Sequence, residues 1–173
     1  IITYGYTGAS PALMYLCTER GVALSFLSPS GRLRAKMATP TKGNVLLRKR
    51  QYSLSDQENV STEYARNFIF GKLNNCRAVL RRYLRDHRGR EFAQQVEYAV
   101  NTLSDQMRRV LETDKLEALR GIEGEGARTY YGVFDFLILE NRNEFYFHGR
   151  TRRPPLDRTN AVLSFLYSLL AHD

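Results

Sequence analysis

Apolar residues that recur every three or four positions constrain the fold of this chain more than any other feature. From residue 61 to residue 86 they predict one long amphipathic helix, because positions three and four apart share a helix face. The same spacing predicts a second helix over Phe92–Leu103, a brief third over Met107–Leu111 and a fourth from Asp114 to about Glu140. A last helix, Asp157–Asp173, is apolar nearly all round, which predicts a core position.

The first 37 residues predict strands, apart from one short helix that begins at Ser10-Pro11 and is closed by Gly21. Alternating and apolar runs predict strands around Ile1–Tyr4, Val22–Leu27 and Arg32–Met37. Since so few strands cannot complete a sheet, and the first residue is Ile1, we expect a piece of a longer protein. The predicted fold class is α+β, with a partial N-terminal β-rich domain and linker over 1–44 and an incomplete all-helical domain over 45–173.

Composition places the chain among folded, non-membrane proteins. An apolar content of 43% with 25% charged residues is typical of a chain that buries a core. No apolar run approaches the ~20 residues that span a bilayer, and no leader opens the chain, so we expect a cytoplasmic protein with no membrane partner. Cys17 and Cys76 lack the spacing of a disulfide framework or a zinc site, which fits a reducing compartment.

The charge is basic and unevenly distributed. The net charge is +8, and 21 of the 26 basic residues are Arg, whose planar fork suits phosphate, although a GC-rich genome would also enrich Arg. Residues 47–90 hold 11 basic and 4 acidic side chains, whereas residues 114–140 hold 3 basic and 6 acidic ones. A basic region beside an acidic helix is what a metal-dependent phosphodiester enzyme needs, one to hold phosphates and one to hold a cation.

The acidic helix carries a carboxylate on its apolar stripe. Glu123 falls on that stripe, whereas Glu125 is turned about 200° away and should be more exposed. A core-facing carboxylate needs a metal, a hydrogen-bond donor or a cation, so Glu123 is either a metal ligand or half of an ion pair with an Arg of another helix. The stripe consists of Leu116, Leu119, Glu123, Ala127, Tyr130, Phe134 and Leu137.

Small and polar residues mark further candidate positions near that carboxylate. Gly121, Gly124 and Gly126 each cost a helix about 1 kcal/mol relative to Ala, which indicates that something approaches the backbone closely. It is either another helix or a phosphate chain. Asn160 interrupts the last helix and, if buried, must hydrogen-bond to a partner such as the glycine-rich helix.

Arginines supply the candidate DNA contacts. Arg150, Arg152 and Arg153 lie in a loop that two prolines stiffen, beside aromatic residues, and such a loop either follows a nucleic-acid strand or is merely solvated. A basic run ends the long helix. The predicted DNA-binding residues are Arg81, Arg82, Arg85, Arg150, Arg152, Arg153 and Arg158.

The motifs, taken in order along the chain, resemble the Cas1 family of CRISPR-associated integrases and endonucleases. The resemblance rests on the GIEGEGAR stretch from Gly121 and on the Arg/Pro loop and Asn helix over 149–165. The stretches from Ile2 to Ser10 and from Arg66 to Leu73 resemble subtype I-C members. The resemblance covers essentially the whole chain.

The resemblance implies a β-rich domain that forms a homodimer and a helical catalytic domain. It also implies Mg²⁺ or Mn²⁺ held by one Glu, one His and one Asp, with DNA and the second universal CRISPR-associated protein as partners. The family's Glu falls on Glu123, while its His and Asp lie beyond Asp173, so the 173-residue chain is expected to be inactive alone.

The sequence is compatible with two functions. The first is a metal-dependent DNA endonuclease and integrase that inserts spacer DNA into the repeat array, with Glu123 as catalytic ligand and Gly121, Gly124 and Asn160 in structural roles. The alternative is a non-catalytic basic DNA-binding or assembly module, in which Glu123 pairs with an Arg. Two further metal ligands near Glu123 would favour the enzyme, and an Arg against Glu123 would favour the alternative.

Overall fold

The computed structural model describes residues 1–37, 43–87 and 89–172, and its contacts divide the chain into two compact units. One unit comprises residues 1–44 and 151–173, and the other comprises residues 45–150. The domains expected from the sequence, 1–44 and 45–173, differ from this division in where the last helix falls, and the domain assignment stays a prediction. Residues 38–42 of the expected linker lie outside the described part.

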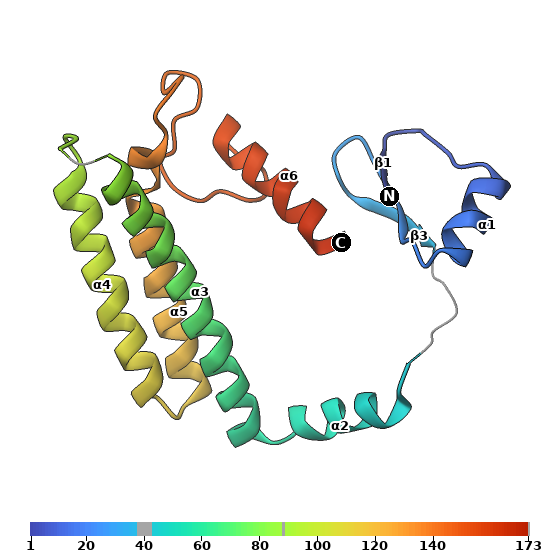
Figure 1. Cartoon of the computed structure of the whole chain (residues 1–173), viewed down its shortest axis with the longest axis horizontal. Helices are drawn as coiled ribbons and strands as arrows, with labels where there is room; N and C mark the ends of the chain where they lie inside the picture. Colours follow the sequence, from blue (N-terminus) through green and yellow to red (C-terminus); the bar gives the residue numbers. More distant parts are fainter. Residues whose placement is uncertain (38–42, 88, 173) are drawn as a thin grey trace. The chain divides into compact units, whose positions relative to one another are not determined.

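The first unit is built on a three-stranded sheet with the order β1-β2-β3. β1 (Ile2–Tyr4) pairs in parallel with β2 (Leu24–Leu27), and β2 pairs antiparallel with β3 (Leu33–Met37). A parallel pair requires a crossover, and α1 (Pro11–Glu19) supplies it (Figure 1). The strands therefore lie where the alternating residues predict them.

The predicted ends of α1 are confirmed. Ser10 Oγ accepts a hydrogen bond from the Leu13 amide at 3.2 Å, and Pro11 is the first helical residue, where its missing N–H costs nothing. Gly21 follows the helix with a φ of 66°, a conformation that residues with a Cβ adopt at a cost. This short helix is thus fixed by local sequence at both ends.

The same unit contains α6 (Arg158–His172), whose Phe165 ring lies 5.5 Å from the ring of Tyr4 on β1. The prediction that α6 is buried nearly all round is wrong for the described residues. The neighbours present cover only part of the helix, and several large apolar side chains are exposed. They are Val162, Phe165, Leu166, Tyr167 and Leu170.

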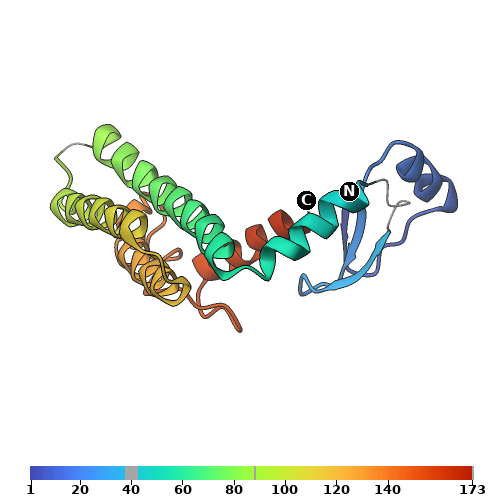
Figure 2. The ribbon, with the colours of Figure 1, turned by 90° about the horizontal axis from the view of Figure 1, so that it is seen from below.

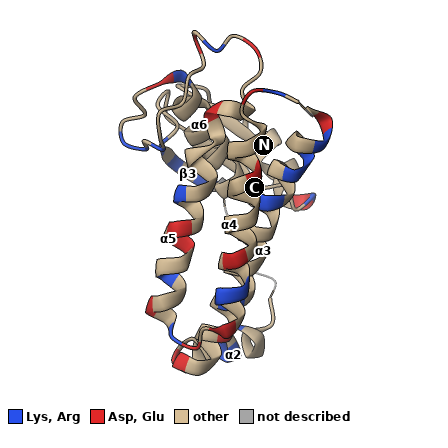
Figure 3. Cartoon of the chain, turned by 90° about the vertical axis from the view of Figure 1, so that its left-hand side faces the viewer, with Lys and Arg blue, Asp and Glu red and all other residues tan. Residues whose placement is uncertain are grey.

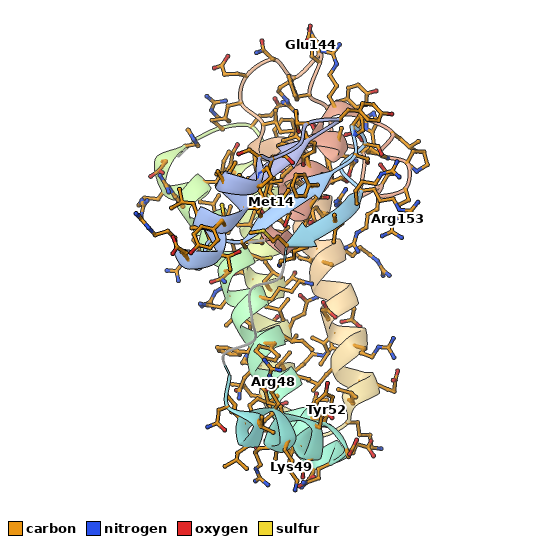
Figure 4. All side chains as sticks on the ribbon, turned by 90° about the vertical axis from the view of Figure 1, so that its right-hand side faces the viewer. Met14, Arg48, Lys49, Tyr52, Glu144 and Arg153 are labelled. Atoms are coloured by element: carbon orange, nitrogen blue, oxygen red, sulfur yellow. The ribbon has the colours of Figure 1, made fainter. Side chains whose placement is uncertain are left out.

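Three helices that lie side by side form the second unit: α3 (Glu58–Asp86), α4 (Ala93–Glu112) and α5 (Leu116–Gly132) (Figures 1 and 2). α2 (Val45–Ser55) packs against α3 and buries none of its residues. Its Arg48, Lys49 and Tyr52 side chains project from the helix (Figure 4). The 3₁₀ turn η1 (Phe134–Leu137) follows α5.

Aliphatic side chains from all three long helices fill the core of this bundle. The stripe predicted for α3 is confirmed at Ile69, Leu73, Leu80 and Tyr83, but Phe68, on its edge, is exposed. The side chains with almost no exposed area are Leu73, Leu80, Val96, Leu103, Val110 and Leu119. Among the described residues, no helix is long and apolar enough to cross a membrane.

Two helix boundaries differ from the prediction. The helices expected over Phe92–Leu103 and Met107–Leu111 are one continuous helix, because Gln106, between them, is buried and donates a hydrogen bond to Thr129 Oγ1 at 3.3 Å. The helix expected to reach Glu140 ends at Gly132. Glycine commonly ends helices, so this boundary had a signal in the sequence.

Candidate active site

Glu123 lies on α5 and faces α3. Its Oε1 accepts a hydrogen bond from Lys72 Nζ at 2.6 Å, and the Glu123 side chain is 42% exposed. The carboxylate is therefore paired with a cation from another helix, although the cation is a Lys where the sequence argument expected an Arg. A pair this exposed is screened by water and adds little to stability.

The predicted burial of Glu123 is wrong. The buried positions of α5 are Leu119, Ile122 and Gly126, so the centre of the apolar face runs through Ile122. Because successive residues are about 100° apart, Glu123 lies at the edge of that face. The Glu125 side chain is 44% exposed, almost the same as the 42% of Glu123, so the expected difference in exposure between the two is also wrong.

The two glutamates serve opposite flanks of α5. Glu125 Oε2 accepts a hydrogen bond from Arg109 Nη1 of α4 at 2.6 Å, and this bond raises the pKa of Arg109 above its usual range. Since Glu123 and Glu125 are about 200° apart, one reaches α3 and the other reaches α4. Acidic and basic positions are interspersed along α5 accordingly (Figure 3). Glu125 is thus a matched control for Glu123.

The three glycines of α5 differ in what surrounds them. A Cβ placed on Gly126 would lie 2.2 Å from Leu73 Cδ2, so α3 approaches the backbone there and a close contact is confirmed. Among the described residues nothing lies within 4 Å of a Cβ placed on Gly121 or Gly124. The expected close approach to the backbone is therefore not seen at Gly121 or Gly124 and occurs at Gly126.

Asn160 connects the Arg/Pro loop to the start of α6. It is fully buried, and its Oδ1 accepts a hydrogen bond from the Thr151 amide at 3.0 Å. Its Nδ2 donates to Asp157 Oδ2 at 2.6 Å, while Asp157 Oδ1 caps the helix by accepting from the Asn160 amide at 2.7 Å. Thr151 Oγ1 in turn accepts from the Leu156 amide at 3.0 Å. These bonds order the loop; a bond from Asn160 to the glycine-rich helix stays a prediction.

The arginines expected to contact DNA differ in exposure. Arg152, Arg153 and Arg158 are exposed, whereas Arg150 is half-buried. Figure 4 shows Arg153 extending from the loop. Exposed guanidinium groups in an ordered loop fit phosphate contacts.

The basic end of α3 is exposed as well. Arg81, Arg82 and Arg85 all face solvent. Arg85 donates a hydrogen bond to Asp86 at 2.9 Å and Arg82 lies 3.5 Å from the same carboxylate, and both lower the pKa of Asp86, Arg85 more strongly. One carboxylate against three arginines leaves the end of the helix basic.

The residues of this chain do not by themselves fit a divalent cation. Within the described ranges no group of three or more His, Cys, Asp or Glu side chains could hold a metal ion. Glu123 has an ammonium group as its nearest charged neighbour, where a metal would need further oxygen or nitrogen ligands. Glu125 of the same motif is paired with Arg109, and Asp157, beside the Arg/Pro loop, is occupied as a helix cap.

Two residues at the site were missed by the sequence argument. Lys72 lies in the segment that supplied part of the family resemblance, but its position opposite Glu123 depends on how α3 and α5 pack. The sequence does not by itself distinguish Gly126 from Gly121 and Gly124, although Gly126 alone among the three lies on the buried line Leu119–Ile122–Gly126. Placing the centre of the stripe on Ile122 would have identified it.

Solved structures with the same fold show the fold class of this chain. A casposase bound to integration product superimposes with a TM-score of 0.76 at 23% identity, covering 98% of this chain and 46% of that one. A CAS1 protein from Thermotoga maritima superimposes with a TM-score of 0.73 at 20% identity, covering 98% of this chain and 50% of that one. The small sheet followed by a mostly helical region is thus the Cas1 fold.

Sequence comparison then gives the family. All of residues 1–173 match the family described as CRISPR associated protein Cas1, and the chain belongs to it. It is 43% identical over 173 residues to CRISPR-associated endonuclease Cas1 1 of Chlorobaculum tepidum, covering 100% of this chain and 50% of the relative. It is 43% identical over 178 residues to CRISPR-associated endonuclease Cas1 2 of Rhodospirillum rubrum, covering 100% and 51%. The chain spans about half the length of these relatives.

Proposed function

We propose that this chain forms part of a DNA endonuclease and integrase of CRISPR adaptation, which inserts spacer DNA into the repeat array. The observation that carries the proposal is Cas1 family membership along the whole chain, with relatives named as endonucleases at 43% identity. Because the chain spans about half of those relatives, the activity is proposed for a longer protein that contains it. Subtype I-C is proposed on the segments 2–10 and 66–73.

The proposed reaction is a strand transfer between two DNA molecules. A 3′-hydroxyl oxygen of the incoming DNA attacks a phosphodiester of the repeat, a new P–O bond forms, and the old P–O bond breaks to leave a free hydroxyl. Negative charge builds on the phosphate oxygens in the transition state, and the enzyme must stabilise it. The arginines of this chain hold the strands by their phosphates, with Arg152 and Arg153 as the most exposed candidates of the loop.

Glu123 is proposed as one ligand of Mg²⁺ or Mn²⁺, with the remaining ligands supplied from outside this chain. Support comes from its position: the carboxylate is half-exposed, so it is accessible, and it already attracts a cation in Lys72. Since one carboxylate cannot fix the position and geometry of a divalent ion, the 173-residue chain alone is expected to be inactive.

Three partners are proposed. DNA follows from the proposed reaction and the basic surface. A homodimer and the second universal CRISPR-associated protein follow from family membership, and a solved relative with a TM-score of 0.73 is described as a Cas6-RT-Cas1–Cas2 complex. A cytoplasmic location accords with these partners.

A non-catalytic DNA-binding or assembly module remains the second candidate, because the Lys72–Glu123 ion pair at 2.6 Å favours it. In that case Glu123 serves only to connect α5 to α3. The carboxylate would then be replaceable by any pairing residue without loss of function.

Metal-dependent cleavage of branched DNA separates the two candidates. With Mg²⁺ or Mn²⁺, we expect the longer protein to cleave, the Glu123→Ala variant to be inactive, and the Glu125→Ala variant to retain activity. Glu125 is the matched control because the two glutamates are about equally exposed and both are ion-paired. Cleavage by Glu123→Ala at the wild-type rate would favour the non-catalytic module. Robust cleavage by the 173-residue chain alone would show that it holds a complete site.

A further inference from the structure

The Lys72–Glu123 ion pair lies at the surface where α3 packs against α5. Leu73, the next residue of α3, is buried and directly faces the backbone of Gly126 on α5, so the two helices are close there. This packing brings Lys72 Nζ to 2.6 Å from Glu123 Oε1, although 51 positions separate the two residues. The Lys72 side chain is 49% exposed and the Glu123 side chain 42%. A charged partner from solution can therefore reach either member of the pair.

The fold leaves most of the bonding capacity of Lys72 unused. By contrast, Arg66 of the same helix donates two hydrogen bonds to the Thr113 carbonyl, at 3.1 and 2.8 Å, and so ties α3 to the end of α4. Lys72 makes one hydrogen bond, to Glu123. Among the described residues, the other two donors of its ammonium group and Glu123 Oε2 have no partner. The Lys72–Glu123 pair is thus a single contact between two groups that can each accept another partner.

The two helices that flank α5 differ in charge. α3 holds six basic and three acidic residues, a net charge of +3, whereas α4 holds two basic and three acidic residues, a net charge of −1. A polyanion such as DNA is therefore attracted to the flank that carries Lys72. On the α4 flank, the Arg109–Glu125 pair has the same 2.6 Å separation and exposures of 53% and 44%. It is a matched control for the Lys72–Glu123 pair.

Replacing Glu123 by a DNA phosphate as the partner of Lys72 is energetically favourable. An exposed ion pair of this kind is weak and easily broken. A lysine that contacts a DNA phosphate releases a condensed counterion, a gain in entropy that the Glu123 carboxylate does not offer. The ammonium group is a compact charge on a flexible four-carbon stem, so it can turn from the carboxylate to a phosphate without movement of α3.

We propose that Lys72 changes its partner when DNA binds: its ammonium group leaves Glu123 and contacts a phosphate of the DNA backbone. The Glu123 carboxylate, ion-paired in the free protein, then loses the one cation that it contacts among the described residues. Binding of DNA and release of Glu123 are thereby coupled, and each favours the other. The proposal rests on the proposed DNA function and adds to it a contact that regulates the candidate site.

The salt dependence of duplex DNA binding measures the new contact. The titrations use the longer protein that contains this chain, in EDTA, so that binding is measured without reaction. We expect Lys72→Gln to make the slope of log K against log salt shallower by about 0.9, because one phosphate is no longer neutralised. Lys72→Arg, which keeps the charge, should retain the wild-type slope, and Arg109→Gln should leave it unchanged. An unchanged slope in Lys72→Gln, or an equal loss in Arg109→Gln, would overturn the proposal.

A zero-length cross-link reports on the ion pair itself. A carbodiimide activates the Glu123 carboxylate, and the Lys72 amine then forms an amide with it, so mass spectrometry detects the two joined peptides. We expect this cross-link in the free protein and its loss, in step with binding, as duplex DNA with unreactive 5′-hydroxyl ends is added. A cross-link that persists at saturating DNA would overturn the change of partner even if the salt slope became shallower, because Lys72 would then bridge both groups.

Glu123→Gln tests the coupling from the side of the carboxylate. With no ion pair to break, this variant should bind duplex DNA about two- to fivefold more tightly in EDTA, the range that a weak exposed pair allows. Glu125→Gln should change the affinity less than twofold. No tightening in Glu123→Gln, or equal tightening in both variants, would overturn the proposal. Absence of DNA binding by the unaltered protein would instead contradict the proposed function itself.

Discussion

At Gly126 a single added methyl group meets the core of the bundle. The new Cβ would lie 2.2 Å from Leu73 Cδ2, and Leu73 is itself buried, so α3 and α5 must separate or Leu73 must change rotamer. Gly126→Ala should therefore lower the free energy of unfolding by about 1–3 kcal/mol, the usual cost of overpacking. Urea denaturation of the 173-residue chain measures it.

Gly124→Ala is the matched control for this prediction. Its Cβ enters open space, so the helix propensity of alanine should raise the free energy of unfolding by up to about 1 kcal/mol. Equal effects at the two positions would mean that α3 and α5 do not pack as described.

The Lys72–Glu123 pair should contribute little to stability. Both side chains are nearly half-exposed, and exposed pairs contribute about 0–1 kcal/mol. A double-mutant cycle with Lys72→Ala and Glu123→Ala, followed by urea denaturation, should give a coupling free energy in that range. A much larger coupling would assign Glu123 to structure and favour the non-catalytic module.

At the scale of whole elements, the sequence correctly predicted the features that depend only on neighbouring residues. The ends of α1 follow from Ser10, Pro11 and Gly21, and the α3 stripe follows from its three- and four-residue spacing. Neither depends on a distant part of the chain. This is why their positions were predictable.

The register of α5 depends on packing and was mispredicted. Stripes through Ile122 or through Glu123 both satisfy the spacing, and only packing against α3 and α4 decides between them. The predicted break in the helix before Met107 is wrong for a similar reason, because Gln106 is polar yet buried against Thr129 of α5. The partner of Glu123 could not be predicted, because the Lys72–Glu123 ion pair joins residues 51 positions apart in the sequence.

The loop before α6 should depend on Asn160 for its order. Removing the side chain takes the Asn160 Oδ1 acceptor from the Thr151 amide and the Asn160 Nδ2 donor from Asp157 Oδ2, while the backbone amide of residue 160 still donates to Asp157 Oδ1. Asn160→Ala should therefore cost about 1–3 kcal/mol and accelerate hydrogen exchange at the Thr151 and Leu156 amides. Asn101→Ala, at an exposed position of α4, is the control and should leave both amides protected. Unchanged exchange in Asn160→Ala would mean that the loop is ordered by other interactions.

For the molecule as a whole, DNA binding should be governed by interactions with phosphates. Replacing Arg152 and Arg153 with Gln should weaken binding of all sequences alike, because these side chains neutralise phosphates without reading bases. The slope of log K against log salt should become shallower by about 0.9 for each phosphate that is no longer neutralised. Arg108 and Arg120, exposed and paired with carboxylates on their own helices, provide the control double variant. An unchanged slope would mean that the loop is merely solvated.

The central claim is that Glu123 takes part in joining DNA strands, and strand transfer tests it most directly. The measurement is the rate at which the longer protein joins a labelled 3′-hydroxyl end to repeat DNA in Mg²⁺ or Mn²⁺, compared between Glu123→Gln and Glu125→Gln. We expect a loss of at least about 100-fold for Glu123→Gln, the scale typical of a group that stabilises transition-state charge, and a change of less than about twofold for Glu125→Gln. Equal rates in the two variants, with both proteins folded, would contradict the claim.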